Sequence, residues 1–300
     1  MNTRIIPERI EFSHICSLFP RRRSDSHKGD FGRLLCITGS VRMPGAAAMS
    51  TYAALRSGAG LVTTATAKQN IPALSSRIWE SMYLPLETDR EGFIKWHGNE
   101  GKITEALMKA DAVLIGCGMG VTEETRLLTE EVLERTDVPV VLDADGLNAA
   151  AQCIDILSER KAPVILTPHP GEMARLIGES TLQVQNDRVK AVLELQKYIS
   201  DESTAVLKGQ GTLIGYKGGM LINHTGNSGM SRGGSGDVLA GMTASFAAQG
   251  LSPADSAAAS VYIHGAAGDI AAERYSQQSM LPQDIINCIG EVFLKIEGSR

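Results

Sequence analysis

The sequence predicts an α/β fold in three layers: a mainly parallel, doubly wound sheet with helices on both faces. Short apolar runs bounded by glycine alternate with Ala-rich or amphipathic stretches along most of the chain. Such runs are typical of strands that are buried on both faces. Where strands and helices alternate, each crossover returns the chain parallel to the preceding strand, which favours this architecture over a sandwich or a bundle.

The first strand–helix–strand unit is predicted between residues 33 and 66. An apolar run at 33–40 follows a polar, glycine-punctuated loop. Pro44 and Gly45 begin an Ala-rich helix that reaches residue 56, and the next strand occupies residues 61–66. Upstream, the spacing of apolar residues indicates a short helix over residues 7–18.

The same alternation continues as far as residue 208. Four strands are predicted at residues 112–115, 138–142, 163–167 and 204–208, and the helices between them at 123–135, 172–177 and 182–200. A hairpin signature follows, because two apolar runs at 212–216 and 220–223 flank Lys217-Gly218-Gly219. The remainder is predicted to be helical from about Asp237, over 253–274 and over 282–296.

Composition limits the partners of the protein and its location. The chain has 300 residues, a net charge of −5 and a pI near 5.7, which argues against nucleic acid or an anionic membrane as the main partner. No apolar run approaches the roughly 20 residues that span a bilayer. The five cysteines form no CxxC pair and indicate buried thiols in a reducing compartment. We therefore expect a cytoplasmic protein without a membrane or nucleic-acid partner.

The domain organisation is predicted to be simple. No linker, charge block, internal repeat or low-complexity stretch divides the chain. We expect one domain over residues 1–300, with residues 1–25 as an N-terminal extension.

The strongest chemical signal is the Gly-rich stretch at residues 223–237, which runs into a segment with Leu239, Met242 and Phe246 at helical spacing. Backbone N–H groups and the helix dipole make such a loop suitable for phosphate. A carboxylate at the same place, Asp237, is consistent with a base that takes a proton from a nucleophile attacking phosphorus. The alternative is an ordinary N-cap, and capping and catalysis are compatible.

Other unusual residues follow the carboxyl ends of the predicted strands, where doubly wound sheets bind their ligands. They are Gly39-Ser40 and the segments 116–120, 143–148, 169–172 and 208–211. This pattern predicts one composite site. Residues 116–120 allow either close approach of a ligand or only a tight turn. Lys208 is either a phosphate contact or a solvated strand end.

Two acidic segments leave further alternatives open. Glu172 lies in a first helical turn, where it either holds Mg²⁺ through water or compensates the helix dipole. His169, between two prolines, is either functional or structural. Asp143 and Asp145 point to the same side, and one is expected to bind ligand or metal-bound water while the other caps the helix beginning at Gly146.

Four segments in consistent order resemble the ribokinase-like superfamily, and most closely the ADP- or ATP-dependent NAD(P)H-hydrate dehydratase family. They are residues 28–32 with Gly39-Ser40, and the stretches 44–62, 166–172 and 225–241. The resemblance covers about residues 26–290. It implies a lyase that dehydrates the S form of hydrated NADH or NADPH, coupled through a phosphorylated intermediate to hydrolysis of ATP, or of ADP to AMP.

The resemblance also implies roles for particular residues. Asp237 would be the catalytic base, and Glu172 would serve Mg²⁺. The hydrated nucleotide would be lined by Ala46, Gly118, His169 and Asp237. The ADP would be lined by Lys208, Gly209, Gln210, Gly211, Thr212, Gly226, Asn227 and Gly236. The family further implies a homotetramer, with NAD(P)H-hydrate epimerase as a functional partner on a separate chain because this chain has no room for a fused epimerase domain.

Three places depart from the family pattern: Cys117 and Ser228 stand where proline is usual, and Ser231-Arg232 replaces a smaller pair. None removes a catalytic group, and Arg232 could add a phosphate contact. The alternative function is a small-molecule hydroxyl kinase of the same superfamily, of the thiazole or hydroxymethylpyrimidine type, which leaves the phosphate on its product. A nucleotide sensor without turnover is the alternative from another class.

Overall fold

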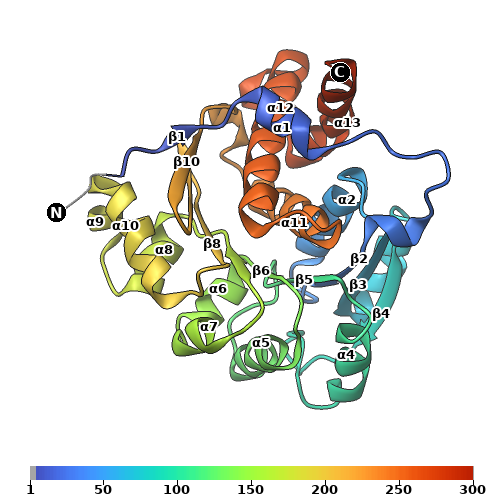
Figure 1. The fold of residues 1–300 in the computed structure, drawn as a ribbon. Helices are drawn as coiled ribbons and strands as arrows, with labels where there is room; N and C mark the ends of the chain where they lie inside the picture. The colour runs from blue at the N-terminus through green and yellow to red at the C-terminus, as the bar shows by residue number, and fades with distance from the viewer. Residues whose placement is uncertain (1–4, 300) are drawn as a thin grey trace.

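The computed structural model describes residues 5–299, which build one ten-stranded sheet (Figure 1). The strand order is β1-β10-β9-β8-β7-β6-β5-β2-β3-β4, and β9 alone runs antiparallel to its neighbours β8 and β10. The strands are β1 Glu8–Arg9, β2 Arg33–Ile37, β3 Leu61–Ala67, β4 Met82–Leu86, β5 Ala112–Ile115, β6 Val140–Leu142, β7 Val164–Leu166, β8 Thr204–Leu207, β9 Thr212–Tyr216 and β10 Gly219–Asn223. The predicted mainly parallel sheet is confirmed.

Helices occupy both faces of this sheet. They are α1 Phe12–Leu18, α2 Pro44–Arg56, α3 Ile71–Ser75, α4 Glu100–Leu107, α5 Glu123–Arg135, α6 Asp145–Ala150, α7 Asp155–Glu159, α8 Pro170–Ile177, α9 Thr181–Asn186, α10 Arg188–Leu195, α11 Ser235–Ala248, α12 Pro253–Ser279 and α13 Pro282–Gly298. In Figure 1, α2, α11, α12 and α13 lie on one side, and α4, α5, α7 and α8 on the other.

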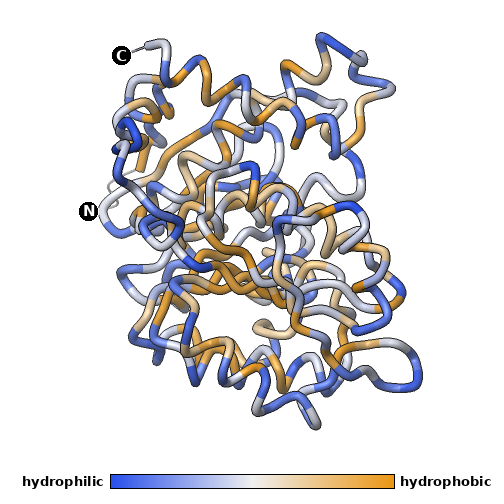
Figure 2. The backbone as a smooth tube through the Cα atoms, turned by 90° about the vertical axis from the view of Figure 1, so that its right-hand side faces the viewer, coloured by the Kyte–Doolittle hydropathy of each residue, from blue (hydrophilic) through white to orange (hydrophobic). Residues whose placement is uncertain are grey.

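The sheet separates two hydrophobic cores. Successive residues of a strand point to opposite faces, so Leu34 and Cys36 of β2 pack toward α11 and α12, whereas Leu35 and Ile37 pack toward α5 and α8. Figure 2 shows the apolar strands running through the middle of the molecule between layers with more hydrophilic outer faces. This arrangement confirms the three layers.

The prediction of one continuous helix over residues 182–200 is wrong. It is broken into α9, α10 and a short 3₁₀ turn. Asp187 has a non-helical backbone (φ −143°, ψ 80°) and its side chain accepts a hydrogen bond from Lys190 N. A residue that caps a new helix ends the previous one, although the apolar spacing continues across the break.

Two other regions differ from the prediction. The segment between β3 and β5 contains the edge strand β4 and the helix α4, which were not predicted. Near the N-terminus, the predicted helix over residues 7–18 begins only at Phe12, because Glu8 and Arg9 pair with β10 instead. Within residues 5–299, no helix is both long and apolar enough to cross a membrane.

Candidate active site

The turn that starts α11 is built around a glycine. Gly234 has φ 100°, and a Cβ there would lie 2.3 Å from Met49 Sδ. The N–H groups of a first helical turn have no partner within the helix, and of these Ser235 N is already bonded to Arg232 O. The turn thus directs the remaining N–H groups at the carboxyl edge of the sheet, where an anion would meet them. The helix predicted near Asp237 is confirmed.

Two buried polar atoms accompany this turn. Ser235 Oγ and His264 Nε2 are buried and have no hydrogen-bond partner among the described residues. Burial, reinforced by the charge of Lys208, lowers the pKa of His264 to about 4. His264 is therefore neutral at pH 7. Buried polar atoms without a partner are costly, and an anion at the turn would give the Ser235 hydroxyl an acceptor.

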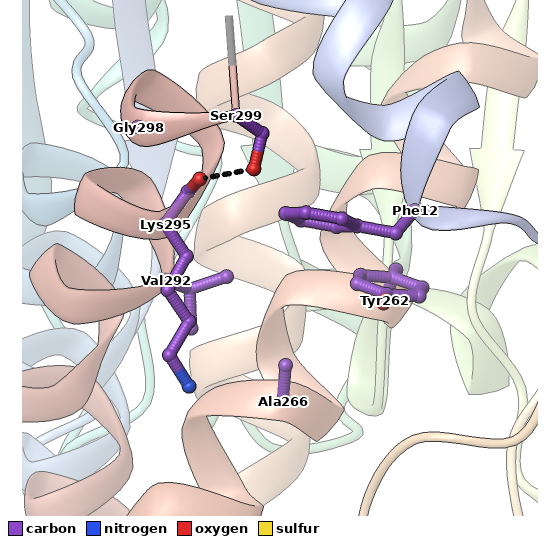
Figure 3. A pocket seen from close by; sticks show the side chains of 7 residues that line it. All are labelled: Phe12, Tyr262, Ala266, Val292, Lys295, Gly298 and Ser299. Carbon is purple, nitrogen blue, oxygen red and sulfur yellow. Dashed lines mark hydrogen bonds between the residues drawn. The ribbon is translucent and has the colours of Figure 1, made fainter.

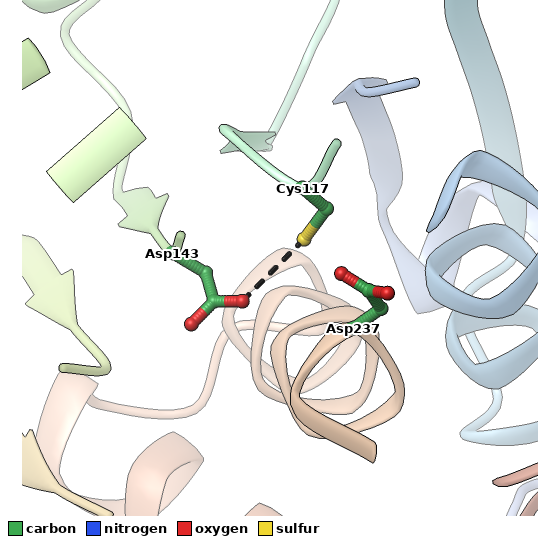
Figure 4. Close-up of side chains that lie close together, drawn as sticks. All are labelled: Cys117, Asp143 and Asp237. Atoms are coloured by element: carbon green, nitrogen blue, oxygen red, sulfur yellow. Dashed lines mark hydrogen bonds between the residues drawn. The ribbon is translucent and has the colours of Figure 1, made fainter. Parts of the chain in front are cut away.

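Asp237 lies in the first turn of α11 and faces the ends of β5 and β6 (Figure 4). Burial raises its pKa from 3.8 to about 6, and the negative charge of Asp143 adds to the effect, while Cys117 and Lys208 oppose it. A carboxylate with this pKa is ionised at pH 7 and is a stronger base than an exposed one. Its side chain is not the N-cap of α11, since Gly234 is.

Lys208 follows β8, and its side chain lies beside acidic residues that follow β6 and β7. Its Nζ lies 2.6 Å from Asp143 Oδ1 and 3.7 Å from Glu172 Oε2. Burial lowers the pKa of Lys208, but Asp143 and Glu172 outweigh that effect and raise the pKa above its ordinary value. A Cβ on Gly236 would lie 3.5 Å from Lys208 Nζ and 3.8 Å from Asp143 Oδ2. Lys208 is therefore a largely shielded ammonium beside the α11 turn and not a solvated strand end.

The helix cap expected from Asp143 or Asp145 is not found, because Ala144 is the N-cap of α6 and no side chain caps it. Asp143 is only 1% exposed and accepts a 2.8 Å hydrogen bond from Thr167 Oγ1 in addition to its pairing with Lys208. Asp145 does not cap its own helix. Its Oδ2 instead accepts from Gly120 N at 2.7 Å, and so holds the turn that follows β5.

His169 and Glu172 form a reciprocal cap at the start of α8. His169 Nδ1 accepts from Gly171 N at 2.9 Å and Glu172 N at 3.3 Å, and Glu172 Oε2 accepts from His169 N at 2.8 Å. Because Nδ1 accepts, the neutral imidazole carries its proton on Nε2, which lies 3.3 Å from Glu172 Oε1. The half-exposed ring edge of His169 remains available to a ligand.

Ala46 and Gly118 come together although 72 residues separate them in the sequence. Gly118 has φ 66°, and a Cβ there would lie 2.5 Å from Ala46 Cβ. Gly118 O also accepts from Ser40 N at 2.7 Å. The turn after β5 thus packs against the start of α2 beside Cys117, which contacts Asp143. The structure therefore brings these two proposed substrate residues to the Asp237 end of the site.

The segment from Lys208 to Thr212 is held from α10. The guanidinium of Arg188 donates to Leu207 O at 3.1 Å, Gly211 O at 3.3 Å and Lys208 O at 3.4 Å. Gly209 has φ 136°, and Thr212 Oγ1 donates to Gly209 O at 2.8 Å. With their carbonyls tied down, these residues form a fixed turn, and Gln210 at its tip is exposed.

Gly226 and Asn227 are fixed by Asp269 of α12. Asp269 Oδ2 accepts from Gly226 N at 2.9 Å, and Asp269 Oδ1 accepts from Asn227 Nδ2 at 2.9 Å. Asn227 Nδ2 also donates to Gly268 O at 3.0 Å. The loop is therefore anchored to α12 ahead of the turn that carries Asp237.

Sequence reasoning missed Arg188 and Asp269. Both lie on helices, at positions without any motif, and their partners are 20 and 43 residues away. Arg232, which could add a phosphate contact, donates from its guanidinium to Gln278 O.

A metal ion needs suitable donors at this site. Cys117, Asp143 and Asp237 offer ligand atoms within 4.8 Å of one another, but thiols are poor ligands for the hard cation Mg²⁺, and Lys208 already neutralises Asp143. Glu172 is a better candidate. Among the described residues its Oε1 has only the 3.3 Å contact with His169 Nε2, so that oxygen retains lone pairs for a metal-bound water.

Two surface hollows lie elsewhere. One, of about 570 Å³, lies between α1, α12 and α13, and Phe12, Tyr262 and Lys295 contribute to its lining (Figure 3). The other, of about 410 Å³, is lined from β2, β3, β4 and α4. None of the strand-end residues described above lines either hollow. The geometry of charges and backbone donors therefore identifies the candidate site.

This geometry suits phosphoryl transfer. A helix N-terminus with a largely shielded lysine beside it can hold a phosphate, and a carboxylate with a raised pKa lies at the same turn to take a proton from an attacking hydroxyl.

Comparison with protein families agrees with this chemistry. A family model described as NAD(P)H-hydrate dehydratase matches residues 34–291. A bifunctional NAD(P)H-hydrate repair enzyme of Moorella thermoacetica is 39% identical over 283 residues, which are 94% of this chain and 53% of that protein. The chain thus spans about half the length of the curated bifunctional relatives it matches.

Solved structures show the same similarity over the whole fold. An ADP/ATP-dependent NAD(P)H-hydrate dehydratase of Bacillus subtilis, co-crystallised with ATP and Mg²⁺, superposes with a TM-score of 0.80 at 28% identity and covers 97% of this chain and 99% of that one. A ribokinase-like superfamily protein of Enterococcus faecalis gives a TM-score of 0.83 at 30% identity, with 96% of each chain covered. The fold is therefore ribokinase-like, as predicted.

Proposed function

The chain belongs to the NAD(P)H-hydrate dehydratase family, and on this premise we propose that it dehydrates the S form of hydrated NADH or NADPH at the expense of ADP or ATP. The observation that carries the proposal is the position of Asp237, a carboxylate with a pKa of about 6 in the first turn of α11. A base next to a phosphate-binding turn is what the activation of a hydroxyl group requires.

The proposed reaction has two steps. The oxygen of the C6 hydroxyl attacks the terminal phosphorus of the nucleotide, while Asp237 takes the hydroxyl proton. The bond from that phosphorus to its bridging oxygen breaks, so ATP leaves as ADP, or ADP leaves as AMP. The C6–O bond of the new phosphate ester then breaks with loss of a proton from C5, which restores the dihydronicotinamide ring and releases phosphate.

This coupling has a simple physical reason. Hydroxide is a poor leaving group and phosphate is a good one, so phosphorylation lowers the barrier to elimination. General base catalysis by Asp237 is typically worth about 10²–10⁴ in rate. The N–H groups of the α11 turn would contribute roughly 3 kcal/mol for each well-aimed donor, and the unpartnered hydroxyl of Ser235 supports a phosphate at this place.

The two substrates are assigned to opposite ends of the site. We place the hydrated nucleotide against Ala46, Gly118 and His169, next to Asp237. The adenine nucleotide is placed along residues 208–212, which Arg188 holds, and against Gly226, Asn227 and Gly236. Glu172 would hold Mg²⁺ through water, and the cation would offset negative charge on the transferred phosphoryl group.

A coupled assay tests the proposal. The purified protein is incubated with hydrated NADH and either ADP or ATP, and both the near-ultraviolet absorbance of the dihydronicotinamide ring and the released phosphate are followed. Return of the absorbance together with phosphate release supports the dehydratase. A stable phosphorylated product without NADH would instead establish the kinase alternative, and nucleotide binding without any product would indicate a sensor.

The assembly is a separate part of the proposal. We propose a homotetramer that acts after an NAD(P)H-hydrate epimerase on another chain. Ala257, Ala258 and Ala259 of α12 are fully buried within the subunit and do not form the interface. Light scattering of the purified protein measures the mass, and a monomer at catalytic concentrations would refute the tetramer.

A further inference from the structure

Cys117, Asp143 and Asp237 bring three side chains that can bind a metal ion together from three parts of the fold. Their sulfur and oxygen atoms all lie within 4.8 Å of one another. Figure 4 shows them pointing toward one another from the segments after β5 and β6 and from the first turn of α11. Cys117 is 0% exposed and Asp143 1%, whereas Asp237 is only partly buried. A small ion would therefore reach the cluster past Asp237.

One oxygen of Asp143 is turned toward the thiol. Lys208 Nζ and Thr167 Oγ1 both donate to Asp143 Oδ1, at 2.6 Å and 2.8 Å. Asp143 Oδ2 instead accepts from Cys117 Sγ at 3.7 Å. A sulfur and an oxygen ligand of a tetrahedral zinc ion lie about 3.5 Å apart, because the Zn–S and Zn–O bonds are roughly 2.3 Å and 2.0 Å long. The thiol and Asp143 Oδ2 therefore already have the spacing of two zinc ligands.

The charges of the cluster also favour a divalent cation. When the thiol is deprotonated, Cys117, Asp143 and Asp237 are all anionic, and the Lys208 ammonium pairs with Asp143. These four groups then carry two net negative charges, which one divalent ion neutralises. In the protein alone, burial and the negative charge of Asp143 raise the pKa of Asp237 to about 6. The cluster is thus short of positive charge.

We propose that Cys117, Asp143 and Asp237 form a binding site for a thiophilic divalent cation such as Zn²⁺, and that this ion reversibly inhibits the enzyme. Zinc binds thiolates strongly, whereas Mg²⁺ prefers oxygen ligands. The ion forms bonds to Cys117 Sγ, to Asp143 Oδ2 and to one oxygen of Asp237, and the thiol proton is released to water. A water molecule fills the fourth position, while Lys208 keeps its pairing with Asp143 Oδ1.

The inhibition rests on the proposed role of Asp237 as the base, but the metal site itself does not. A carboxylate that is bound to zinc no longer accepts a proton from the hydroxyl of the hydrated nucleotide. The inhibiting ion is distinct from the Mg²⁺ assigned to Glu172, whose Oε1 lies beside His169 and not beside the thiol. An excess of Mg²⁺ should therefore not prevent the inhibition.

Metal binding tests the site without turnover. Co²⁺ replaces Zn²⁺ in sites of this kind, and a thiolate ligand gives it a charge-transfer band in the near ultraviolet. We expect one equivalent of Co²⁺ to bind with this band, and Zn²⁺ to remove the band. Cys117→Ala should lose the band and weaken Zn²⁺ binding at least about tenfold. Cys36→Ala is the matched control, since Cys36 is equally buried on the neighbouring strand β2, and it should bind both ions like the unaltered protein.

Kinetics test the consequence. Zn²⁺ should inhibit the turnover of hydrated NADH, and Cys117→Ala should need at least about tenfold more Zn²⁺ than Cys36→Ala for the same fractional loss of its own rate. Zinc that is held by the nucleotide affects both variants alike.

Two results would overturn the site: a charge-transfer band that persists in Cys117→Ala, or Zn²⁺ binding that is equal in the two variants. Zinc bound at Cys117 without any loss of turnover would refute the inhibition. If the protein lacks dehydratase activity altogether, the proposed function fails, while the cobalt band still decides whether the metal site exists.

Discussion

The Nζ atom of Lys208 lies 2.6 Å from Oδ1 of Asp143, and this ion pair joins the end of β8 to the end of β6 across β7. Asp143 is 2% exposed at its side chain and Lys208 18%. The pair is therefore shielded from solvent, unlike the many ion pairs on the surface.

Removing the lysine should be costly. Lys208→Met leaves the Asp143 carboxylate buried without its cation, so we expect the free energy of unfolding in denaturant to fall by about 3–5 kcal/mol. Lys217→Met is the control, because the Lys217–Asp201 pair is exposed and such pairs contribute about 0–1 kcal/mol. Equal losses in the two variants would show that Lys208 has no special electrostatic role.

Asp237→Asn should separate catalysis from stability. We expect it to bind ADP but to lose about 10²–10⁴ in turnover, because the base is gone. Burial raises the pKa of Asp237 from 3.8 to about 6, so ionisation at pH 7 costs the folded state about two pKa units, or roughly 3 kcal/mol. The amide avoids this cost and should raise the unfolding free energy at pH 7 by up to that amount.

The gain in unfolding free energy in Asp237→Asn should depend on pH. The stabilisation by protonated Asp237 is fully present below pH 3.8 and is lost as the pH rises through about 6, so the gain should vanish in acid. Asp255→Asn makes the same change in the first turn of α12 and should leave turnover intact. Unchanged turnover in Asp237→Asn would remove this residue from the mechanism.

Activity should depend on pH through the same group. The base must be ionised, so kcat/KM is expected to be level above about pH 6 and to fall tenfold for each pH unit below it. Steady-state rates with hydrated NADH between about pH 5 and pH 8 measure this profile. A flat profile over that range would contradict the raised pKa of Asp237.

Asp269→Asn should weaken nucleotide binding without changing the chemical step. An amide has one acceptor oxygen, so either Gly226 N or Asn227 Nδ2 loses its partner and the loop loosens. We expect the KM for ADP to rise about tenfold, from a loss of about 1–3 kcal/mol, with kcat nearly unchanged. Glu273→Gln, on an exposed position of the same helix, is the control, and equal KM values in the two variants would contradict the anchor.

The sequence was most informative where its signals are local. The strands at residues 112–115 and 212–216, the helix at 123–135 and the helix start near Asp237 were all predictable, because glycine, proline and apolar spacing act over a few residues. The collection of chemical groups at the strand ends was also predictable, since it follows from a parallel sheet.

Long-range contacts were not predictable in the same way. Nothing near Arg188 or Asp269 shows that their side chains fix loops 20 or 43 residues away. The break at Asp187 was hidden because apolar spacing continues across it. The pairing of Asp143 with Lys208 depends on a separation of 65 residues, and only the folded sheet brings the two groups together.

The packing of α11 has a consequence for how the molecule acquires its activity. Ser245 Oγ of α11 donates to Ala54 O at the end of α2, 191 residues earlier, so the helix that carries the base docks onto a helix that is synthesised long before it. Contacts of such sequence separation form slowly. A nascent chain would therefore remain inactive until α11 has been made, and the regain of turnover should be one of the last events when the unfolded protein is allowed to refold.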